Sequence, residues 1–297
     1  LTIRVPNDST ALSLGADGIA RQISAMSPET TVLRNGSRGA AWLEPLVELE
    51  TEAGWLGFAN VDASQIDTIL RDGKKHTSCI GLVEEHPYFA GQQRLTFSRI
   101  GLFDPLDIDA YTAMRGFAGL QNALSLAPRA IVQSVKDSGL RGRGGAAFPA
   151  GIKWQTVLDT PADQKYVVCN ADEGDSGTFA DRLVMECDPF VLIEGMVISG
   201  LAVGATRGYI YLRREYPLAF ERLQQAIALA RGRGWLGDDI QGSGTQFELE
   251  VRLGADAYIC GEETSLLESL EGKRGMVRSK PPLPAIEGLF GKPTVVN

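Results

Sequence analysis

Histidine and cysteine are scarce in this chain of 297 residues, which holds two histidines and four cysteines. Neither His76 nor His86 is flanked by other ligand-type residues at a metal-binding spacing, so no zinc site is predicted. The cysteines form no C-x-x-C pair, which argues against a disulfide framework and against a self-contained metal site. We therefore expect reduced thiols and no metal ligands in this chain.

Long apolar runs and an excess of positive charge are also missing. No run of about 18 apolar residues occurs, and residues 1–4 do not resemble a signal peptide. The formal net charge is −8, so the overall field repels nucleic acid. Hydrophobic residues make up 44% of the chain and charged residues 22%, as is typical of globular proteins. We expect a cytoplasmic protein that binds no nucleic acid and does not insert directly into a membrane.

Two regions with different patterns of apolar residues follow one another, and we predict a domain boundary between residues 104 and 105. In residues 1–104, short β-type runs alternate with helical stretches, which predicts a small α+β domain. These runs and stretches occupy residues 1–5, 15–25, 31–33, 42–49 and 64–71. The stretch 94–104 alternates apolar and polar residues before a turn at Asp104-Pro105, which predicts a last strand leaving the first domain.

Residues 105–297 read instead as alternating helices and strands. Strands are expected at 166–170, 208–212 and 247–253, and helices at 108–126, 128–138, 189–203 and 217–231. This order indicates an α/β domain with a mainly parallel sheet flanked by helices. The chain lacks an initiator methionine and ends within an apolar, ordered segment, so we expect a fragment of a longer protein.

A glycine-rich loop precedes the first strand of this second region. Gly142, Gly144 and Gly145 permit close approach of a ligand to bare amides, and Arg143 and Lys153 add positive charge for an anionic group. The spacing superficially matches a Rossmann fingerprint, but a helix rather than a strand precedes it. The loop therefore predicts a binding site for a phosphate or a flat ring, with a flexible surface loop as the alternative.

An acidic loop directly follows the buried strand at 166–170. Ligands bind beyond the carboxyl ends of strands in open α/β sheets, and this loop stands at such an end. Asn170, Asp172, Glu173 and Asp175 can accept hydrogen bonds from sugar or ribityl hydroxyls. A solvated turn and a magnesium or calcium site are the alternatives, although the spacing does not fit an EF-hand.

A second acidic pair, Glu262 and Glu263, is expected in the first turn of a helix, where carboxylates complement the helix dipole. Both carboxylates could also bind sugar hydroxyls, and together they would repel a 2′-phosphate, which favours NAD over NADP. The proline-rich end at 280–297 contributes Thr294 and Asn297 as candidate phosphate or ring partners. A packed connector is the alternative reading of that end.

Four motifs occur in a fixed order: Gly139-Leu-Arg-Gly-Arg-Gly-Gly-Ala-Ala-Phe-Pro149, Cys169-Asn-Ala-Asp-Glu173, Tyr258-Ile-Cys-Gly-Glu-Glu-Thr264 and Gly291-Lys-Pro-Thr294. Together they resemble the NADH-binding flavoprotein subunit shared by respiratory complex I, NAD-reducing hydrogenases and molybdenum formate dehydrogenases. The resemblance covers residues 105–297. The first region, through Ala11–Asp17 and Gln93–Arg99, resembles the thioredoxin-like domain of the β subunit of soluble NAD-dependent formate dehydrogenase.

The resemblance implies that FMN and NAD(H) share one pocket and exchange a hydride, with no side chain needed as acid or base. The residues implied for FMN are Gly142, Arg143, Gly144, Lys153, Asn170, Asp172, Tyr258, Gly261, Glu262 and Asn297. Those implied for NAD(H) are Phe148, Glu173, Asp175, Glu263 and Lys280, with Phe148 stacking on the adenine and Glu173 supporting catalysis.

This sequence departs from the family pattern at several points. Asp175 stands where respiratory relatives carry glutamate, and Thr156 and Leu283 stand where they carry stacking aromatics. The cysteine motif for a [4Fe-4S] cluster is absent, and that cluster is expected only in a C-terminal region beyond this sequence. The first region has only Cys79, so it cannot hold the [2Fe-2S] cluster of four-cysteine relatives.

The partners implied are a small [2Fe-2S] thioredoxin-like subunit and a large molybdenum or hydrogenase-type subunit. The resemblance favours a formate dehydrogenase, with the equivalent subunit of a hydrogenase or respiratory NADH dehydrogenase as the alternative. Two alternatives of other classes are a non-redox nucleotide-binding scaffold and a metal-dependent hydrolase that uses the carboxylates of the two acidic loops.

Overall fold

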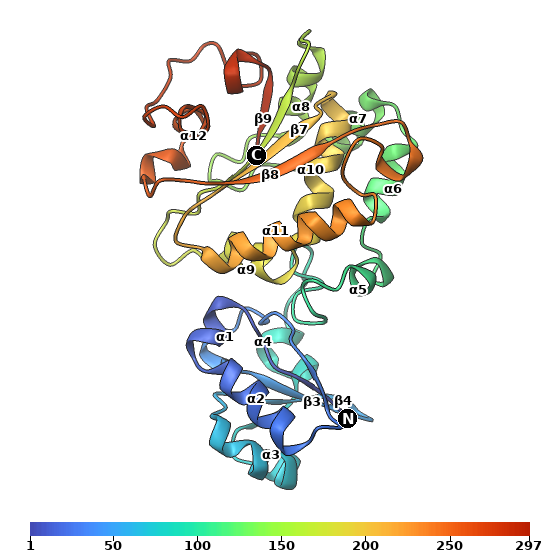
Figure 1. Cartoon of the computed structure of the whole chain (residues 1–297), viewed down its shortest axis with the longest axis vertical. Coiled ribbons are helices and arrows are strands. Elements are labelled where there is room, and N and C mark those ends of the chain that lie inside the picture. The colour runs from blue at the N-terminus through green and yellow to red at the C-terminus, as the bar shows by residue number, and fades with distance from the viewer. The chain divides into compact units, whose positions relative to one another are not determined.

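A computed structural model describes residues 1–297, and contacts between residues divide the chain into two compact units (Figure 1). The first unit comprises Leu1–Ala110 together with Leu183–Asp188, and the second comprises Tyr111–Arg182 and Pro189–Asn297. The first unit is therefore discontinuous in sequence.

The first unit is built on a five-stranded sheet with strand order β2-β1-β3-β4-β5. β1 and β2 are parallel and are connected through helices, whereas β3, β4 and β5 follow as antiparallel neighbours. The strands are β1 (Thr2–Arg4), β2 (Thr31–Leu33), β3 (Val47–Thr51), β4 (Gly54–Phe58) and β5 (Cys79–Leu82), and the helices are α1 (Ser9–Ser13), α2 (Ala16–Met26), α3 (Ile66–Asp72) and α4 (Pro87–Ala90). A parallel pair followed by an antiparallel hairpin is the thioredoxin-like arrangement, which confirms the predicted α+β fold of this part.

The core of this unit lies between the sheet and its helices. Ile19 and Ile23 of the amphipathic helix α2 are buried against Ile3 of β1 and Phe58 of β4. Burying each such side chain contributes roughly 1.5–3 kcal/mol, so this contact between helix and sheet supplies much of the favourable free energy of folding of the unit.

A buried ion network ties β1 to β3 in the same unit. The Glu48 carboxylate receives Arg4 Nη1 at 3.1 Å and Arg38 Nε at 2.5 Å, and all three side chains are buried. The Arg4 guanidinium also lies 3.6 Å from the centre of the Trp55 ring, which adds a cation–π contact. The Glu48 carboxylate thus balances two buried guanidinium groups, of which Arg38 also pairs with the exposed Glu84 at 3.1 Å.

Residues 183–188 complete the first unit from a distant part of the chain. They form the end of α9 (Ala180–Cys187), whose buried Glu186 accepts hydrogen bonds from the Ser9 amide at 2.8 Å and the Ser9 hydroxyl at 2.6 Å. Arg99 pairs with the buried Asp188 at 3.0 Å. The Glu186 contact satisfies orphan donors at the start of α1.

The second unit is built on a sheet of four parallel strands in the order β8-β7-β6-β9. The strands are β6 (Tyr166–Ala171), β7 (Arg207–Leu212), β8 (Glu248–Leu253) and β9 (Thr294–Val296). The helices are α5 (Ile108–Ala113), α6 (Ala118–Leu124), α7 (Pro128–Asp137), α8 (Ala150–Asp159), α10 (Pro189–Val203), α11 (Pro217–Gly232) and α12 (Glu263–Leu270). The predicted α/β class with a parallel sheet flanked by helices is confirmed.

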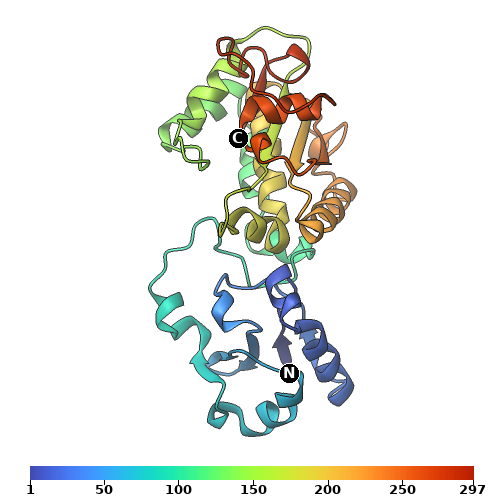
Figure 2. The same cartoon turned by 90° about the vertical axis from the view of Figure 1, so that its left-hand side faces the viewer.

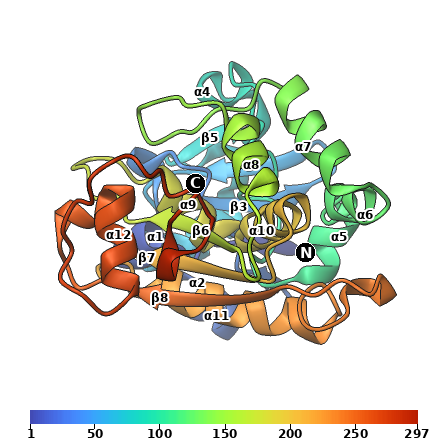
Figure 3. The ribbon, with the colours of Figure 1, turned by 90° about the horizontal axis from the view of Figure 1, so that it is seen from above.

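Helices cover both faces of this sheet, as a buried parallel sheet requires. Val168 of β6 and Tyr211 of β7 pack with Leu266 and Leu267 of α12 on one face of the sheet. Figure 2 shows the orange-red helix α12 beside the sheet. The opposite face is approached so closely by α10 that a side chain on Gly200 of α10 or Gly208 of β7 would collide with the Phe247 ring. α11 runs beside the edge strand β8 (Figure 3).

Three elements differ from the sequence predictions. The helix expected at 108–126 is two short helices, because Arg115 and Phe117 adopt positive φ between them. The stretch 94–104 forms turns rather than a strand, and 42–49 begins with a 3₁₀ turn before β3. β4, β5 and β9 were not predicted, because β4 and β5 contain glycines and β9 is short.

None of the helices is both long and apolar enough to cross a lipid bilayer.

Replacing Glu48 with alanine tests the ion network. The Glu48→Ala variant leaves the buried Arg4 without a carboxylate and Arg38 with the exposed Glu84 alone, so we expect a loss of about 3–5 kcal/mol in unfolding free energy. Urea unfolding followed by tryptophan fluorescence measures the loss. Asp67→Ala, which breaks the exposed i,i+4 pair with Arg71, is the matched control and should leave the unfolding curve unchanged. Equal curves for both variants would contradict the assigned role of Glu48.

A second prediction concerns Glu44, which is 3% exposed and whose Oε1 atom has no hydrogen-bond partner. Burial, helped by the nearby charge of Asp8, raises the pKa of Glu44 to about 8. The folded state therefore holds a proton that the unfolded chain releases, so this contribution to stability is present below the ordinary glutamate pKa and is lost as pH rises through about 8.

The Glu44→Gln variant has no ionisable group at this position, so this pH dependence of stability is removed. Between pH 5 and pH 9 we expect the variant to gain stability relative to the parent chain, by an amount on the order of a few kcal/mol. Denaturant unfolding at several pH values measures it. Parallel pH profiles for the two proteins would show that Glu44 ionises normally in the folded state.

Candidate functional site

The candidate site lies where the four parallel strands of the second unit end. Because the strands are parallel, the segments that follow Ala171, Leu212, Leu253 and Val296 all leave the sheet at one edge. Such an edge is where open α/β sheets bind ligands. The acidic loop, the Tyr258 motif and the last residue of the chain are all attached there.

Asn170 joins three of these segments. Its Nδ2 donates to the Gly261 carbonyl at 2.9 Å, its backbone amide donates to the Asn297 carbonyl at 2.7 Å, and its Oδ1 accepts from the Asp172 amide at 3.2 Å. The acidic loop, the 258–265 motif and the end of β9 are therefore held together by one residue. The structure brings these sequence-predicted residues to one place.

Asp172 has an unused acceptor. Its Oδ2 atom is buried and has no hydrogen-bond partner in the chain. Burial raises the pKa of Asp172, and the charge of Arg213 opposes that effect. Buried polar atoms are normally satisfied, so an orphaned carboxylate oxygen in a loop at a ligand-binding edge indicates a donor supplied by a ligand, such as a hydroxyl group.

Tyr258 and Asp175 form an exposed pair across the same edge. The Tyr258 hydroxyl donates to Asp175 Oδ1 at 2.7 Å, which raises the pKa of Tyr258. The ring lies so close to Gly174 that a Cβ there would meet it at 2.8 Å. Glycine at 174 is therefore required for the aromatic ring to lie over the acidic loop.

Glu262, Glu263 and Lys280 form a charged triad at the start of α12. Lys280 Nζ lies 2.9 Å from Glu262 and 2.7 Å from Glu263. Glu262 caps α12 by accepting from the amides of Thr264 and Ser265. Burial opposes ionisation of Glu262, but these hydrogen bonds and Lys280 lower its pKa to about 2. The triad carries one net negative charge, so it repels an anion less strongly than the two carboxylates would without Lys280.

Lys153 connects helix α8 to the end of β9. Its ammonium group donates to the carbonyl of Val296. Burial lowers the pKa of Lys153, the charge of Glu263 opposes this, and Lys280 adds to the lowering. A cation at this point, near the triad and the strand end, is suited to a phosphate or a flavin ring oxygen.

The glycine-rich loop runs from α7 to α8, so a helix precedes it as the sequence indicated. The loop closes on itself through the Gly142 amide, which donates to the Phe148 carbonyl at 2.9 Å. A Cβ added at Gly144 or Gly145 would meet no atom of the chain within 4 Å, and Phe148 is 49% exposed. The loop therefore leaves open space beside the backbone of Gly144 and Gly145.

Glu173 is placed differently from its neighbours. Its carboxylate is only 8% exposed and accepts hydrogen bonds from the amides of Asp181 and Arg182 at the start of α9 and from the Tyr216 hydroxyl. Tyr216 and Arg213, in the loop after β7, were missed in the sequence. Both residues follow a parallel strand and lie at the same edge as the acidic loop, and this position in the sequence could have identified them.

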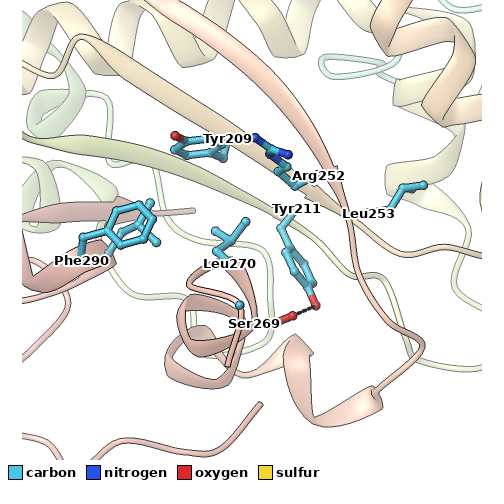
Figure 4. Close-up of a pocket in the computed structure, with 9 residues that line it drawn as sticks. Tyr209, Tyr211, Arg252, Leu253, Ser269, Leu270 and Phe290 are labelled. Atoms are coloured by element: carbon cyan, nitrogen blue, oxygen red, sulfur yellow. Dashed lines mark hydrogen bonds between the residues drawn. The ribbon is translucent and has the colours of Figure 1, made fainter. Parts of the chain in front are cut away.

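A separate cleft of about 270 Å³ lies on the α12 face of the sheet, between β7, β8 and α12 (Figure 4). It is lined by Tyr209, Tyr211, Arg252, Leu253, Ser269, Leu270, Gly272, Leu289 and Phe290. The Tyr211 hydroxyl donates to Ser269 Oγ at 2.9 Å across it. The cleft contains none of the sequence-predicted residues, and its only charged side chain, Arg252, is already paired with Glu250. We therefore place the candidate site at the strand ends instead.

The carboxylates of the two acidic loops do not gather into a metal-binding group. No set of three histidine, cysteine, aspartate or glutamate side chains in the chain is arranged to hold a metal ion.

Comparison with known proteins identifies the family. The sequence model of the Nuo51 FMN-binding domain matches residues 135–297. The chain belongs to this family. The matched residues include the glycine-rich loop and every loop at the carboxyl edge of the parallel sheet, and the open loop and the unsatisfied Asp172 fit the FMN that the family binds.

Similar proteins include components of hydrogenases and of NADH-quinone oxidoreductase. The chain is 54% identical over 206 residues to the NADP-reducing hydrogenase subunit HndC of Solidesulfovibrio fructosivorans, covering 69% of this chain and 42% of that protein. It is 53% identical over 190 residues to the F subunit of NADH-quinone oxidoreductase of Aquifex aeolicus, covering 64% and 44%. The chain thus spans less than half the length of these relatives.

A solved structure of an NAD⁺-reducing [NiFe]-hydrogenase in the H2-reduced state is similar over 100% of this chain and 50% of the solved chain, with 29% identity and a TM-score of 0.57.

Gly144→Ala tests whether the glycine-rich loop binds a ligand. The chain itself has room for the methyl group, so we expect an unchanged melting temperature but FMN binding weakened by about tenfold or more. FMN fluorescence quenching measures the affinity. Gly195→Ala, on α10 and likewise free of contacts, is the control and should bind FMN normally. Unaltered FMN affinity in Gly144→Ala would favour a plain surface loop.

Proposed function

We propose that residues 105–297 bind FMN and NAD(H) at the carboxyl edge of the β8-β7-β6-β9 sheet and catalyse hydride exchange between them. The observation that carries the proposal is the buried, unpaired Oδ2 of Asp172, which stands in the acidic loop of a domain whose family binds FMN. A buried acceptor of this kind is stabilised by a ligand hydroxyl.

The division of the residues between the two ligands follows the family resemblance of the four motifs. For FMN we propose Gly142, Arg143, Gly144, Lys153, Asn170, Asp172, Tyr258, Gly261, Glu262 and Asn297, and for NAD(H) we propose Phe148, Glu173, Asp175, Glu263 and Lys280. When bound, FMN supplies the hydride acceptor and a route for single electrons. The side chains bind and orient the two ligands, and none is assigned a proton-transfer role.

The charged triad bears on the choice of dinucleotide. Glu262 and Glu263 would repel a 2′-phosphate, but Lys280 lies within 3 Å of both and offsets part of this repulsion. We propose a preference for NAD(H), weaker than two unpaired carboxylates would impose. Support for a modest preference comes from the similarity to a subunit named as NADP-reducing.

For the complete protein we propose the flavoprotein subunit of a cytoplasmic NAD-dependent formate dehydrogenase. Its partners would be a small [2Fe-2S] thioredoxin-like subunit and a large molybdenum subunit, with electrons passing through iron–sulfur clusters that include a [4Fe-4S] cluster outside these residues. The narrower assignment to formate rests on the resemblance of Ala11–Asp17 and Gln93–Arg99.

A hydrogenase subunit is the second candidate, favoured by the 54% identity to HndC and by the similar hydrogenase structure. Reduction of NAD⁺ by the purified complex, driven by formate or by hydrogen, decides between the two donors.

Anaerobic titration of the FMN-loaded chain with NADH tests the core proposal. We expect loss of the visible flavin absorbance, and we expect Asp172→Ala to weaken FMN binding by about tenfold or more because a hydrogen-bond acceptor is removed. Asp238→Ala, an exposed aspartate away from the strand ends, is the control. A chain that binds NADH but never FMN would instead support a non-redox nucleotide-binding scaffold.

A further inference from the structure

The loop that follows β7 holds the acidic loop that follows β6. Arg213 Nη1 donates to the backbone carbonyl of Glu173, and the Tyr216 hydroxyl donates to Glu173 Oε2 at 3.0 Å. Arg213 therefore binds the main chain of Glu173, and Tyr216, three positions further along the chain, binds its side chain. These two contacts fix the loop at the residue that directly follows Asp172.

Three hydrogen bonds within the chain hold the carboxylate of Glu173 and leave one acceptor site of Oε1 unoccupied. Oε1 accepts from the Asp181 amide at 2.9 Å, and Oε2 accepts from the Arg182 amide at 3.1 Å and from Tyr216. The two amides are orphan donors at the first turn of α9, where a carboxylate is favoured by the helix dipole. Glu173 thus anchors the acidic loop to a helix terminus.

The Tyr216 hydroxyl stays protonated and can therefore donate its hydrogen bond. It is 5% exposed, and burial, followed by the charge of Glu173, raises its pKa to about 12. The Arg213 guanidinium lies 4.9 Å from the centre of its ring and pairs with Glu215 at 2.7 Å. The phenol therefore stays protonated across the physiological range and is held in place by a cation on its face.

We infer that Tyr216 is a positioning residue for the FMN-binding loop, acting through Glu173 on the orientation of Asp172. Asp172 carries the unpaired oxygen, its own amide is held by Asn170, and the next residue, Glu173, is held by Tyr216, Arg213 and the start of α9. Removal of the Tyr216 hydroxyl leaves the Glu173 carboxylate held only by the Asp181 and Arg182 amides, with no contact to the loop after β7. This inference rests on the proposed binding of FMN.

The test is Tyr216→Phe, which keeps the buried ring and removes only the hydroxyl. We expect the dissociation constant for FMN, measured by fluorescence quenching, to rise about tenfold, which is the usual effect of losing one hydrogen bond to a charged group. The visible spectrum of the bound flavin should also shift, because Asp172 meets it differently. Tyr209→Phe, in the separate cleft, is the matched control and should change neither reading.

A double-variant cycle establishes that the effect passes through Glu173. Glu173→Gln alone should weaken FMN binding, and adding Tyr216→Phe to it should cause little further loss, because the two residues act as one unit. If Tyr216→Phe does not fold, Glu173→Gln carries the test on its own, since it should weaken FMN binding without touching the flavin.

The outcomes separate the inference from the proposed function. If the parent chain binds no FMN, the proposed function fails. If the parent binds FMN and Tyr216→Phe binds it equally, with an unshifted spectrum, the positioning role is overturned while the function stands. A lower melting temperature with unchanged FMN affinity would likewise overturn it, because the hydroxyl would then serve only the fold. Additive losses in the double variant would overturn the route through Glu173.

Discussion

The parallel pairing of β6, β7, β8 and β9 is the constraint on which the candidate site depends. Because all four strands run the same way, four loops separated by as much as 125 residues in sequence, from Asp172 to Asn297, leave the sheet at one edge. No one of these loops forms a cradle alone. Asn170 binds three of them together, and Lys153 adds helix α8 to the same group through its contact with β9.

The parts of the fold that followed from sequence are those whose local preferences agree with their packing. The continuous apolar run of β6 and the helix α10, which begins at a proline, were predicted nearly to the residue because burial on all sides requires such runs. The break between α5 and α6 was not predictable in this way. Phe117 takes a positive φ because it is held by tertiary contacts, with its ring 4.3 Å from Trp235 and its amide bound to the buried Glu194.

The residues of the candidate site likewise divide into those that the sequence could place and those that it could not. Asn170 and Asp172 could be placed at the carboxyl edge from sequence, because polar residues at the end of a buried parallel strand lie there, whereas Gly261 was named only through the family resemblance. The pairing of Lys280 with both Glu262 and Glu263 could not, since a proline-rich segment places it there from 17 residues away. Tyr216 escaped notice because its hydroxyl meets Glu173 only after the crossover connection from β6 to β7 has folded.

The discontinuity of the first unit has a consequence for biosynthesis. A ribosome releases this chain from its N-terminus, and a domain folds as a unit once its last segment has emerged. The first unit needs Glu186 to cap α1 at Ser9 and Asp188 to neutralise Arg99, so the nascent chain must reach Asp188 before that unit is complete. By then the glycine-rich loop and β6 have already left the ribosome. Completion of the N-terminal unit therefore requires that part of the second unit has already been synthesised.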